Sequence, residues 1–231
     1  MKYLDLFTGI GGFTLGIQKT LSNAECVGFS EIDEHAIQIY EYQYPKHTNF
    51  GDITKINPAG LPDFDLLVGG FPCQSFSFAG QRRGFEDTRG TLFFNIVEIL
   101  KIKNPQNFVL ENVKGLIHHD QGRTFKTIIS TLDDLGYDLQ WQVLNSQHFN
   151  VPQNRQRVFI VGHTRNTPRP QIFPILPPEG KTSKESQNGV CASTLTADGA
   201  GDVMKTGSNA ILVKNGTKQG YDVAHVGDGI D

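Results

Sequence analysis

The feature that most constrains the fold is a short apolar run that stops at two glycines and leads into a proline and a cysteine. Residues 64–68 are Phe-Asp-Leu-Leu-Val, and residues 69–73 are Gly-Gly-Phe-Pro-Cys. A run of this length closed by glycines predicts a buried strand that delivers a loop at its carboxyl end. Ligands of α/β proteins bind at that edge of the sheet, so the stretch predicts both an α/β fold and the place of a site.

Cys73 is the candidate nucleophile of that loop. Pro72 fixes the local backbone and lacks an N–H, which orients the thiol, and nearby backbone amides or basic groups would lower its pKa toward the reactive thiolate. The alternative is a small buried thiol without chemistry, which is the commoner role of a cysteine. The neighbours Pro72 and Gln74 favour the nucleophile.

Composition narrows the remaining choices. With 231 residues, 38% hydrophobic and 19% charged, the chain has room for one α/β domain and a small appendage. A formal net charge of −3 argues against a globally basic nucleic-acid binder, so such contacts would come from local basic patches. Three widely spaced cysteines give no disulfide framework, and no segment has the pattern of a signal peptide or membrane span. We therefore expect a cytoplasmic protein without membrane contact.

A glycine-rich turn near the N-terminus is a candidate ligand site. Residues 3–7 predict a strand, residues 8–13 a glycine turn, and the residues up to 21 a helix, an order that brings a ligand close to the backbone. A second strand, residues 26–30, ends at Glu31, where a carboxylate is placed to accept hydrogen bonds from ribose hydroxyls. The alternative is a tight turn of any α/β protein.

A carboxylate and two arginines are further candidates. Residues 107–110 predict a buried strand ending at Glu111, whose carboxylate would be partly desolvated and able to hold or share a proton. Arg155 and Arg157 lie two apart, on one side of an extended segment, where two guanidinium groups can bind a phosphate and a base oxygen. The alternatives are a structural carboxylate and a surface arginine pair.

Two polar segments complete the candidates. Residues 78–90 contain three glycines together with Arg82 and Arg83, which predicts a lid with phosphate contacts. His118, His119 and Asp120 are adjacent, and adjacent residues do not face one site, so we expect a solvated turn and no metal ion.

Six stretches of the chain, taken together, resemble the cytosine-5 DNA methyltransferases of the bacterial restriction-modification type. The resemblance covers residues 1 to about 164, and its motifs occur in the order found in the family. The matching stretches are residues 5–13 (Asp-Leu-Phe-Thr-Gly-Ile-Gly-Gly-Phe), 51–53 (Gly-Asp-Ile), 70–77 (Gly-Phe-Pro-Cys-Gln-Ser-Phe-Ser), 89–94 (Arg-Gly-Thr-Leu-Phe-Phe), 111–113 (Glu-Asn-Val) and 153–157 (Gln-Asn-Arg-Gln-Arg).

The resemblance implies a Rossmann-like S-adenosylmethionine-dependent methyltransferase fold, with a mostly parallel sheet and helices on both faces. It also implies roles for individual residues. The expected S-adenosylmethionine contacts are Phe7, Gly9, Gly11, Gly12, Glu31, Ile32, Asp52, Pro72 and Leu92. The expected catalytic residues are Cys73, Glu111, Arg155 and Arg157, and the expected DNA contacts are Ser75, Ser77, Arg82 and Arg83.

The implied reaction is methylation of carbon 5 of cytosine in duplex DNA, through a covalent adduct of Cys73 with a flipped base. Glu111 would engage ring nitrogen 3 while the thiolate attacks carbon 6. Two alternatives stay open: a tRNA cytosine methyltransferase with the same fold, and a non-catalytic or split-enzyme subunit that binds S-adenosylmethionine.

The composition of the chain changes after about residue 164, where several prolines follow one another closely. We expect a catalytic and cofactor-binding domain over residues 1–165, and a proline-marked linker with part of a target-recognition region over 166–231. The resembled family continues further, so a truncated chain, half of a split enzyme and a degraded copy all fit. A second polypeptide supplying the remaining segment, in a bacterial or phage-infected cell, is the expected partner of the split form.

Overall fold

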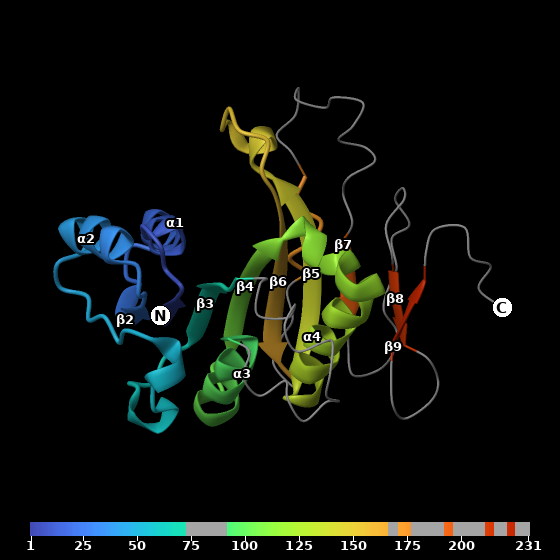
Figure 1. Ribbon diagram of the computed structural model, residues 1–231, viewed down its shortest axis with the longest axis horizontal. Coiled ribbons are helices and arrows are strands. Elements are labelled where there is room, and N and C mark those ends of the chain that lie inside the picture. The colour runs from blue at the N-terminus through green and yellow to red at the C-terminus, as the bar shows by residue number, and fades with distance from the viewer. Residues whose placement is uncertain (73–91, 166–170, 177–191, 196–210, 215–220, 225–231) are drawn as a thin grey trace. The chain divides into compact units, whose positions relative to one another are not determined.

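A computed structural model describes residues 1–72, 92–165, 171–176, 192–195, 211–214 and 221–224 (Figure 1). The chain divides into two compact units, Met1–Leu110 and Glu111–Asp231. No described helix has both the length and the hydropathy needed to cross a lipid bilayer. The predicted boundary near residue 165 stays a prediction.

Parallel strands with intervening helices form the first unit. Its elements are β1 (Lys2–Leu6), α1 (Gly12–Thr20), β2 (Glu25–Ser30), α2 (Glu34–Gln43), the short 3-10 helices η1 (Ile53–Lys55) and η2 (Pro58–Gly60), β3 (Leu66–Gly70), α3 (Leu92–Lys103) and the start of β4 (Asn107–Val113). The strand order is β2-β1-β3-β4, and β1 is parallel to both β2 and β3. Leu6 lies opposite Ser30 and Gly69, so the loops after these three strands leave from one edge.

Fully buried apolar side chains on β1 and α3 explain why the first unit holds together. Tyr3, Leu4 and Leu6 of β1 are fully buried, as are Phe93 and Ile96 of α3. In Figure 1, α3 lies against η1 and η2. These apolar contacts fix the strand ends from which the candidate ligand loops emerge.

Three local expectations were wrong in detail, and the third concerns the first residue of the second unit. We expected residues 49–53 to end a third strand, but they form one bridge, between Asn49 and Phe29, because the Asp52 side chain caps η1 and starts a 3-10 turn. The strand predicted from residue 64 begins at Leu66. Glu111 lies inside β4, not after its end.

Antiparallel pairing dominates the second unit. Its elements are η5 (Lys114–Gly122), α4 (Arg123–Asp134), β5 (Tyr137–Asn145), η6 (Ser146–Phe149), β6 (Gln156–Thr164), β7 (Ala192–Leu195), β8 (Ile211–Lys214) and β9 (Tyr221–Ala224). The strand β5 lies between β6 and β7 and is antiparallel to both, while β8 and β9 form a separate antiparallel pair. The mostly parallel pairing that we expected therefore holds for the described pairs of the first unit, and the pairing of the whole chain is mixed.

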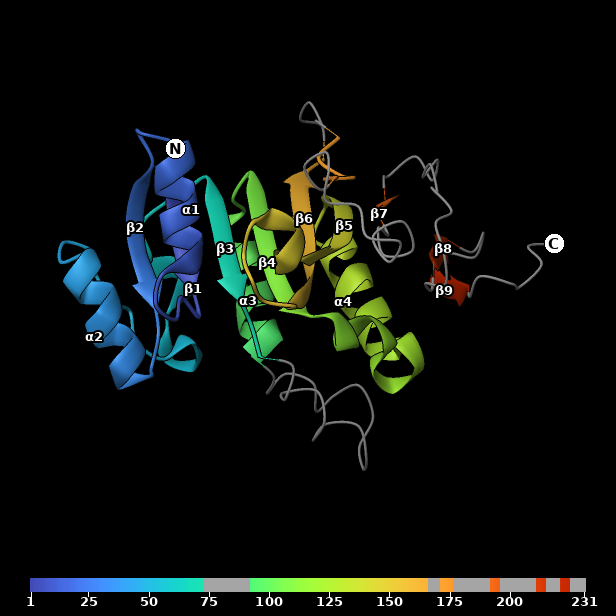
Figure 2. The same cartoon turned by 90° about the horizontal axis from the view of Figure 1, so that it is seen from above.

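The amphipathic helix α4 covers β5 (Figure 2). Its apolar face consists of Phe125, Ile128, Ile129 and Leu132, all buried. The Phe125 ring meets Trp141 of β5 edge to face, with ring centroids 5.7 Å apart. This packing holds β5, and through it β6, in place.

Two buried glutamines of β5 fasten the segment 171–176. Gln140 Oε1 accepts hydrogen bonds from the backbone amides of Ile172 and Phe173, at 2.9 and 3.3 Å. Gln142 binds Ile175 twice, donating to its carbonyl at 3.0 Å and accepting from its amide at 2.8 Å. Part of the predicted linker is thus hydrogen-bonded to the sheet.

Candidate active site

The glycine turn after β1 has the backbone that its sequence predicts. Gly9 and Gly11 have φ values of 55° and 93°, in the left-handed region that glycine adopts at little cost. Phe7 has a φ of 53°, and Gly12 begins α1. The Gly9 amide donates to Glu31 Oε2 at 2.8 Å, so the turn and the predicted ribose ligand meet although they are 22 residues apart in sequence.

Glu31 is fixed by backbone amides on both carboxylate oxygens. Its Oε1 accepts from Ile32 at 2.8 Å and from Asp33 at 3.0 Å. Each carboxylate oxygen has two lone pairs, so Oε2 can accept a ribose hydroxyl in addition to the Gly9 amide. The adjacent Ile32 side chain is 70% exposed and can cover an adenine ring. These residues fit S-adenosylmethionine.

Asn49 links Glu31 to residues 51–53, the segment that contains the predicted cofactor contact Asp52. Our sequence analysis did not select Asn49. Its side-chain oxygen accepts from the amides of Glu31 (3.3 Å) and Gly51 (2.9 Å), and its amide nitrogen donates to the Glu31 carbonyl at 3.2 Å. Gly51 precedes Asp52. Asparagine is common in loops, so the sequence alone does not distinguish Asn49 from other loop residues.

Asp52 makes the contacts of a turn-capping residue. Its Oδ1 accepts from the Thr54 amide at 2.9 Å and from the Thr54 hydroxyl at 2.8 Å. These bonds lower the pKa of Asp52, so the carboxylate is ionised at neutral pH. A contact from Asp52 to the adenine amino group stays a prediction.

The remaining predicted residues of the first unit lie at or beyond a gap in the described chain. Pro72 is exposed and follows the buried Phe71, whose ring lies 5.7 Å from that of Phe93. Leu92 is the first residue of α3. The predicted residues outside the described part are Cys73, Ser75, Ser77, Arg82 and Arg83.

Glu111 and the two predicted arginines come together in the second unit. Arg157 Nε lies 2.8 Å from Glu111 Oε1, and a guanidinium nitrogen of Arg155 lies 3.8 Å from the same oxygen. The Arg157 side chain is 21% exposed and that of Arg155 51% exposed. Both of these contacts are made to Oε1, so the arginines fix this oxygen of the Glu111 carboxylate.

Asn145, also missed from sequence, holds the loop that carries Arg155. The nearly buried side chain accepts hydrogen bonds from the Gln147 and Arg155 amides, both at 3.2 Å. It also donates to Asn154 Oδ1 at 2.9 Å. The Asn145 side chain therefore binds the backbone at both ends of the loop between β5 and β6. These bonds fix the position of the Arg155 backbone.

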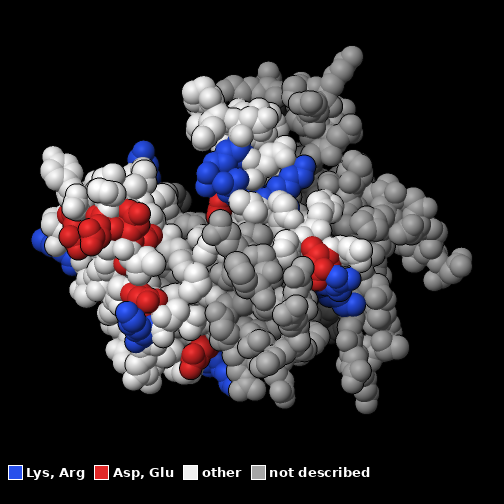
Figure 3. Space-filling model, viewed as in Figure 1, with Lys and Arg blue, Asp and Glu red and all other residues white. Residues whose placement is uncertain are grey.

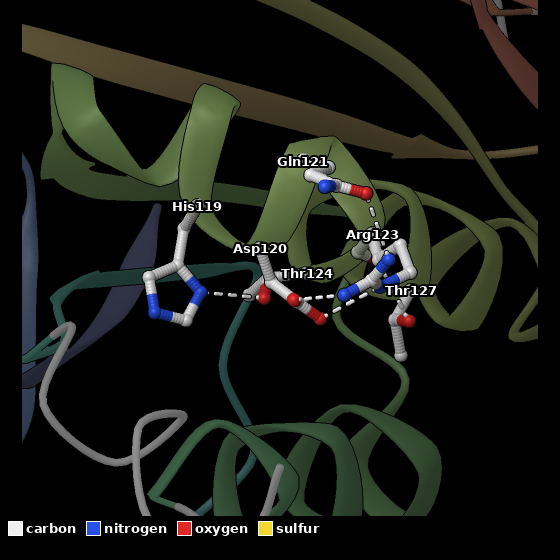
Figure 4. A network of polar contacts seen from close by, with 6 residues as sticks. All are labelled: His119, Asp120, Gln121, Arg123, Thr124 and Thr127. Carbon is white, nitrogen blue, oxygen red and sulfur yellow. Dashed lines mark hydrogen bonds and ion pairs between the residues drawn. The ribbon is translucent and has the colours of Figure 1, made fainter.

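The side chains of His119 and Asp120 have different hydrogen-bond partners. His119 Nδ1 lies 2.7 Å from the Thr124 hydroxyl, whereas Asp120 is directed toward the guanidinium of Arg123 (Figure 4). Asp120 and Gln121 have positive φ values, so this segment is a turn between helices. Within the described ranges, no three His, Cys, Asp or Glu side chains are grouped to hold a metal ion.

One buried carboxyl of the first unit makes folding stability depend on pH. Burial raises the pKa of Asp5 from 3.8 to about 6. The protonated carboxyl therefore favours the folded state below pH 3.8, and this stability is lost as the pH rises through about 6, by about 3 kcal/mol at 1.36 kcal/mol per unit.

We expect Asp5→Asn, which removes this titration, to gain stability relative to the unsubstituted protein between pH 4 and pH 8. Urea unfolding at the two pH values measures the gain. Asp134→Asn, at an exposed position near the end of α4, is the control and should show no such change. Equal pH dependence of both variants would contradict the assignment to Asp5.

The fold and the site together define the class of protein. A parallel sheet edge with a glycine turn, an amide-bound carboxylate after the second strand, and a carboxylate in the fourth strand belongs to the Rossmann-like S-adenosylmethionine-dependent methyltransferases. The sequence model of the C-5 cytosine-specific DNA methylases matches residues 1–220. The chain is a member of this family, and the family uses S-adenosylmethionine.

Similar proteins agree with this assignment. The chain is 47% identical over 179 residues to the type II methyltransferase M.NgoBV of Neisseria gonorrhoeae, an alignment covering 73% of this chain and 42% of that protein. It is 53% identical over 167 residues to M.NgoBI of the same species, covering 72% and 52%. The crystal structure of the S. pombe Dnmt2 methyltransferase superposes with a TM-score of 0.62 at 26% identity, covering 74% of this chain and 53% of that one. The chain thus spans about half the length of the relatives that it matches.

Proposed function

We propose that this chain methylates carbon 5 of cytosine in duplex DNA, with S-adenosylmethionine as donor and a covalent cysteine adduct on a flipped base as intermediate. The observation that carries the proposal is the Glu111 carboxylate, whose Oε1 is held by two arginines, and we assign its Oε2 to the base. Family membership supports the cytosine and DNA specificity.

The order of events follows from the chemistry of the base. Extruding the cytosine costs a few kcal/mol, and Arg155 binds the phosphate of the displaced nucleotide. Ring carbon 6 is a poor electrophile, so Glu111 Oε2 shares a proton with ring nitrogen 3 while the Cys73 thiolate forms a bond to carbon 6. The electron pair moves into the ring and makes carbon 5 nucleophilic.

When bound, S-adenosylmethionine would supply the electrophilic methyl group that carbon 5 takes up, and the electron pair of the broken sulfur–carbon bond would stay on the sulfur of S-adenosylhomocysteine. Loss of the carbon 5 proton to a base then returns an electron pair to the ring. The bond to Cys73 breaks, the thiolate leaves, and the aromatic 5-methylcytosine is restored. Glu31, the glycine turn and Asp52 hold the donor during this sequence.

DNA contacts in this proposal are local. In Figure 3 the described Lys and Arg side chains form small separate groups among acidic and uncharged residues of that face. Phosphate contacts are therefore assigned to Arg155 and to Arg82, Arg83, Ser75 and Ser77 of the segment after Cys73. Binding of duplex DNA should weaken steeply with salt if these contacts are made.

The test is transfer of a labelled methyl group by the 231-residue chain to duplex DNA and, separately, to tRNA. The proposal expects label at carbon 5 of cytosine in DNA, and label in tRNA alone would replace it by the tRNA methyltransferase. Bound S-adenosylmethionine without transfer to either substrate would favour the non-catalytic or split form. Activity restored by a separately expressed C-terminal polypeptide would then identify the split enzyme.

The two arginines are expected to differ in their effects on this reaction. Arg157→Ala removes the close contact to Glu111 and should lower kcat about 100-fold, since a misplaced catalytic group costs that much. Arg155→Ala removes a longer, half-exposed contact and should have a smaller effect on kcat and a larger one on KM for DNA. Steady-state kinetics of both variants make the comparison, and equal kcat values would contradict the assignment.

A further inference from the structure

A chain of polar groups lies behind the glycine turn and takes no part in the proposed chemistry. Thr14 Oγ1 lies 2.8 Å from Asp5 Oδ2 and 3.0 Å from the Tyr40 hydroxyl, and that hydroxyl lies 3.0 Å from His47 Nδ1. Asp5, Thr14 and Tyr40 are fully buried. Burying polar groups costs free energy unless they are hydrogen-bonded, so it matters which group donates and which accepts in each of these contacts.

Counting protons fixes the direction of every bond in the chain. An ionised Asp5 only accepts, so Thr14 donates its single proton to Asp5. In the next pair Tyr40 must then be the donor, which uses its single proton. The Cys26 thiol also lies 3.9 Å from the Tyr40 hydroxyl, but it donates its own proton to the Gly28 carbonyl. His47 Nδ1 must therefore donate to the Tyr40 oxygen. Burial lowers the pKa of His47, so the ring is neutral at pH 8 and carries its proton on Nδ1.

Tyr40 contacts the glycine turn with its ring as well as with its hydroxyl. A Cβ atom on Gly11 would lie 3.0 and 3.1 Å from Tyr40 Cδ2 and Cε2, so the ring packs directly on the backbone of the turn. Thr14, which binds the hydroxyl, lies in the first turn of α1, directly after the glycines. The ring and the hydroxyl together hold the N-terminal end of α1.

The other end of the chain reaches the ribose side of the cofactor site. His47 immediately precedes a segment fixed to β2 by two backbone bonds, from Phe29 to the Thr48 carbonyl (2.9 Å) and from Phe50 to the Phe29 carbonyl (2.7 Å). Asn49 of this segment holds the backbone of Glu31. Tyr40 thus joins the glycine turn to the residues that position Glu31.

We infer that Tyr40 is a positioning residue for S-adenosylmethionine. It acts through the chain of hydrogen bonds in which each donor from His47 to Thr14 points toward Asp5. The inference rests on the proposed function, because it assigns the turn and Glu31 to that cofactor. Tyr40 itself does not touch the cofactor. It fixes the distance between the backbone of the turn and the Glu31 carboxylate.

The test compares two tyrosines of one aromatic cluster by calorimetric binding of S-adenosylmethionine at pH 8. Tyr40→Phe keeps the ring and removes the hydroxyl, and we expect the Kd to rise about 5- to 10-fold, the value of one hydrogen bond. Tyr44→Phe is the matched control, because its ring stacks on His47 at 5.2 Å but lies outside the chain. Its Kd should not change.

Two further measurements separate positioning from general stability. Tyr40→Phe should raise KM for S-adenosylmethionine while kcat and KM for DNA stay within twofold. His47→Leu should weaken binding as Tyr40→Phe does, and His47→Asn should restore it, since the asparagine amide nitrogen replaces Nδ1 as a donor.

Nitrogen chemical shifts of the His47 ring test the chain in the unsubstituted protein and need no variant. A proton on Nε2 in place of Nδ1, or an unchanged Kd in Tyr40→Phe, would overturn the inference. If the unsubstituted protein fails to bind S-adenosylmethionine, the proposed function fails instead. The tautomer of the His47 ring still tests the series of hydrogen bonds from His47 to Asp5.

Discussion

Replacing Cys73 with serine is expected to abolish methyl transfer, lowering kcat by about 10⁴-fold or more. A serine hydroxyl is a far weaker acid than a thiol and a far weaker nucleophile toward carbon 6. The decisive measurement uses duplex DNA that carries 5-fluorocytosine. Fluorine at carbon 5 prevents the final loss of a proton, so the active protein should remain bound as a denaturant-resistant adduct, and Cys73→Ser should form none.

Cys26 provides the matched control for this experiment. Its Sγ donates to the Gly28 carbonyl at 3.3 Å in β2, and burial raises the pKa of the thiol, which therefore stays protonated at neutral pH. Cys26→Ser should retain the adduct. An adduct that persists in Cys73→Ser and disappears in Cys26→Ser would contradict the assignment of the nucleophile.

The parts of the fold that the sequence predicts are those set by local patterns. The strand before the glycine turn and the helices α2 and α4 follow from apolar periodicity and from caps such as Asp33, whose side chain accepts from the Ala36 amide at 2.8 Å. The meeting of Gly9 with Glu31 follows from strand order, because parallel neighbours end at one edge.

Contacts that depend on pairing between distant segments are not visible in the sequence. Arg157 reaches Glu111 through its position at the start of β6, and no local pattern predicts that geometry. Asn145, Asn49 and Tyr40 act through hydrogen bonds to residues that become neighbours only in the fold. Polar residues of these types occur in most loops and helices, so their sequence signal is weak.

Replacing Glu111 with glutamine is expected to lower kcat by roughly 10²- to 10⁴-fold, the range of general acid–base catalysis. Glutamine keeps the size of the side chain and an oxygen that can accept from Arg157 Nε, but its amide cannot hold or share the proton at ring nitrogen 3. The Kd for S-adenosylmethionine should stay unchanged, because its proposed ligands are other residues. Rapid-quench transfer with saturating DNA measures the chemical step.

A double-mutant cycle with Arg157→Ala distinguishes the catalytic role of Glu111 from a purely structural ion pair. If Glu111 served only as the partner of Arg157, Glu111→Gln would add nothing once Arg157 had been removed. If Oε2 engages the base, the same substitution still removes the shared proton in the Arg157→Ala background and lowers kcat further. The orientation seen here, with both arginines on Oε1, predicts the second outcome. A cycle in which the double variant equals Arg157→Ala would remove Glu111 from the chemistry and leave it as an anchor for the arginine.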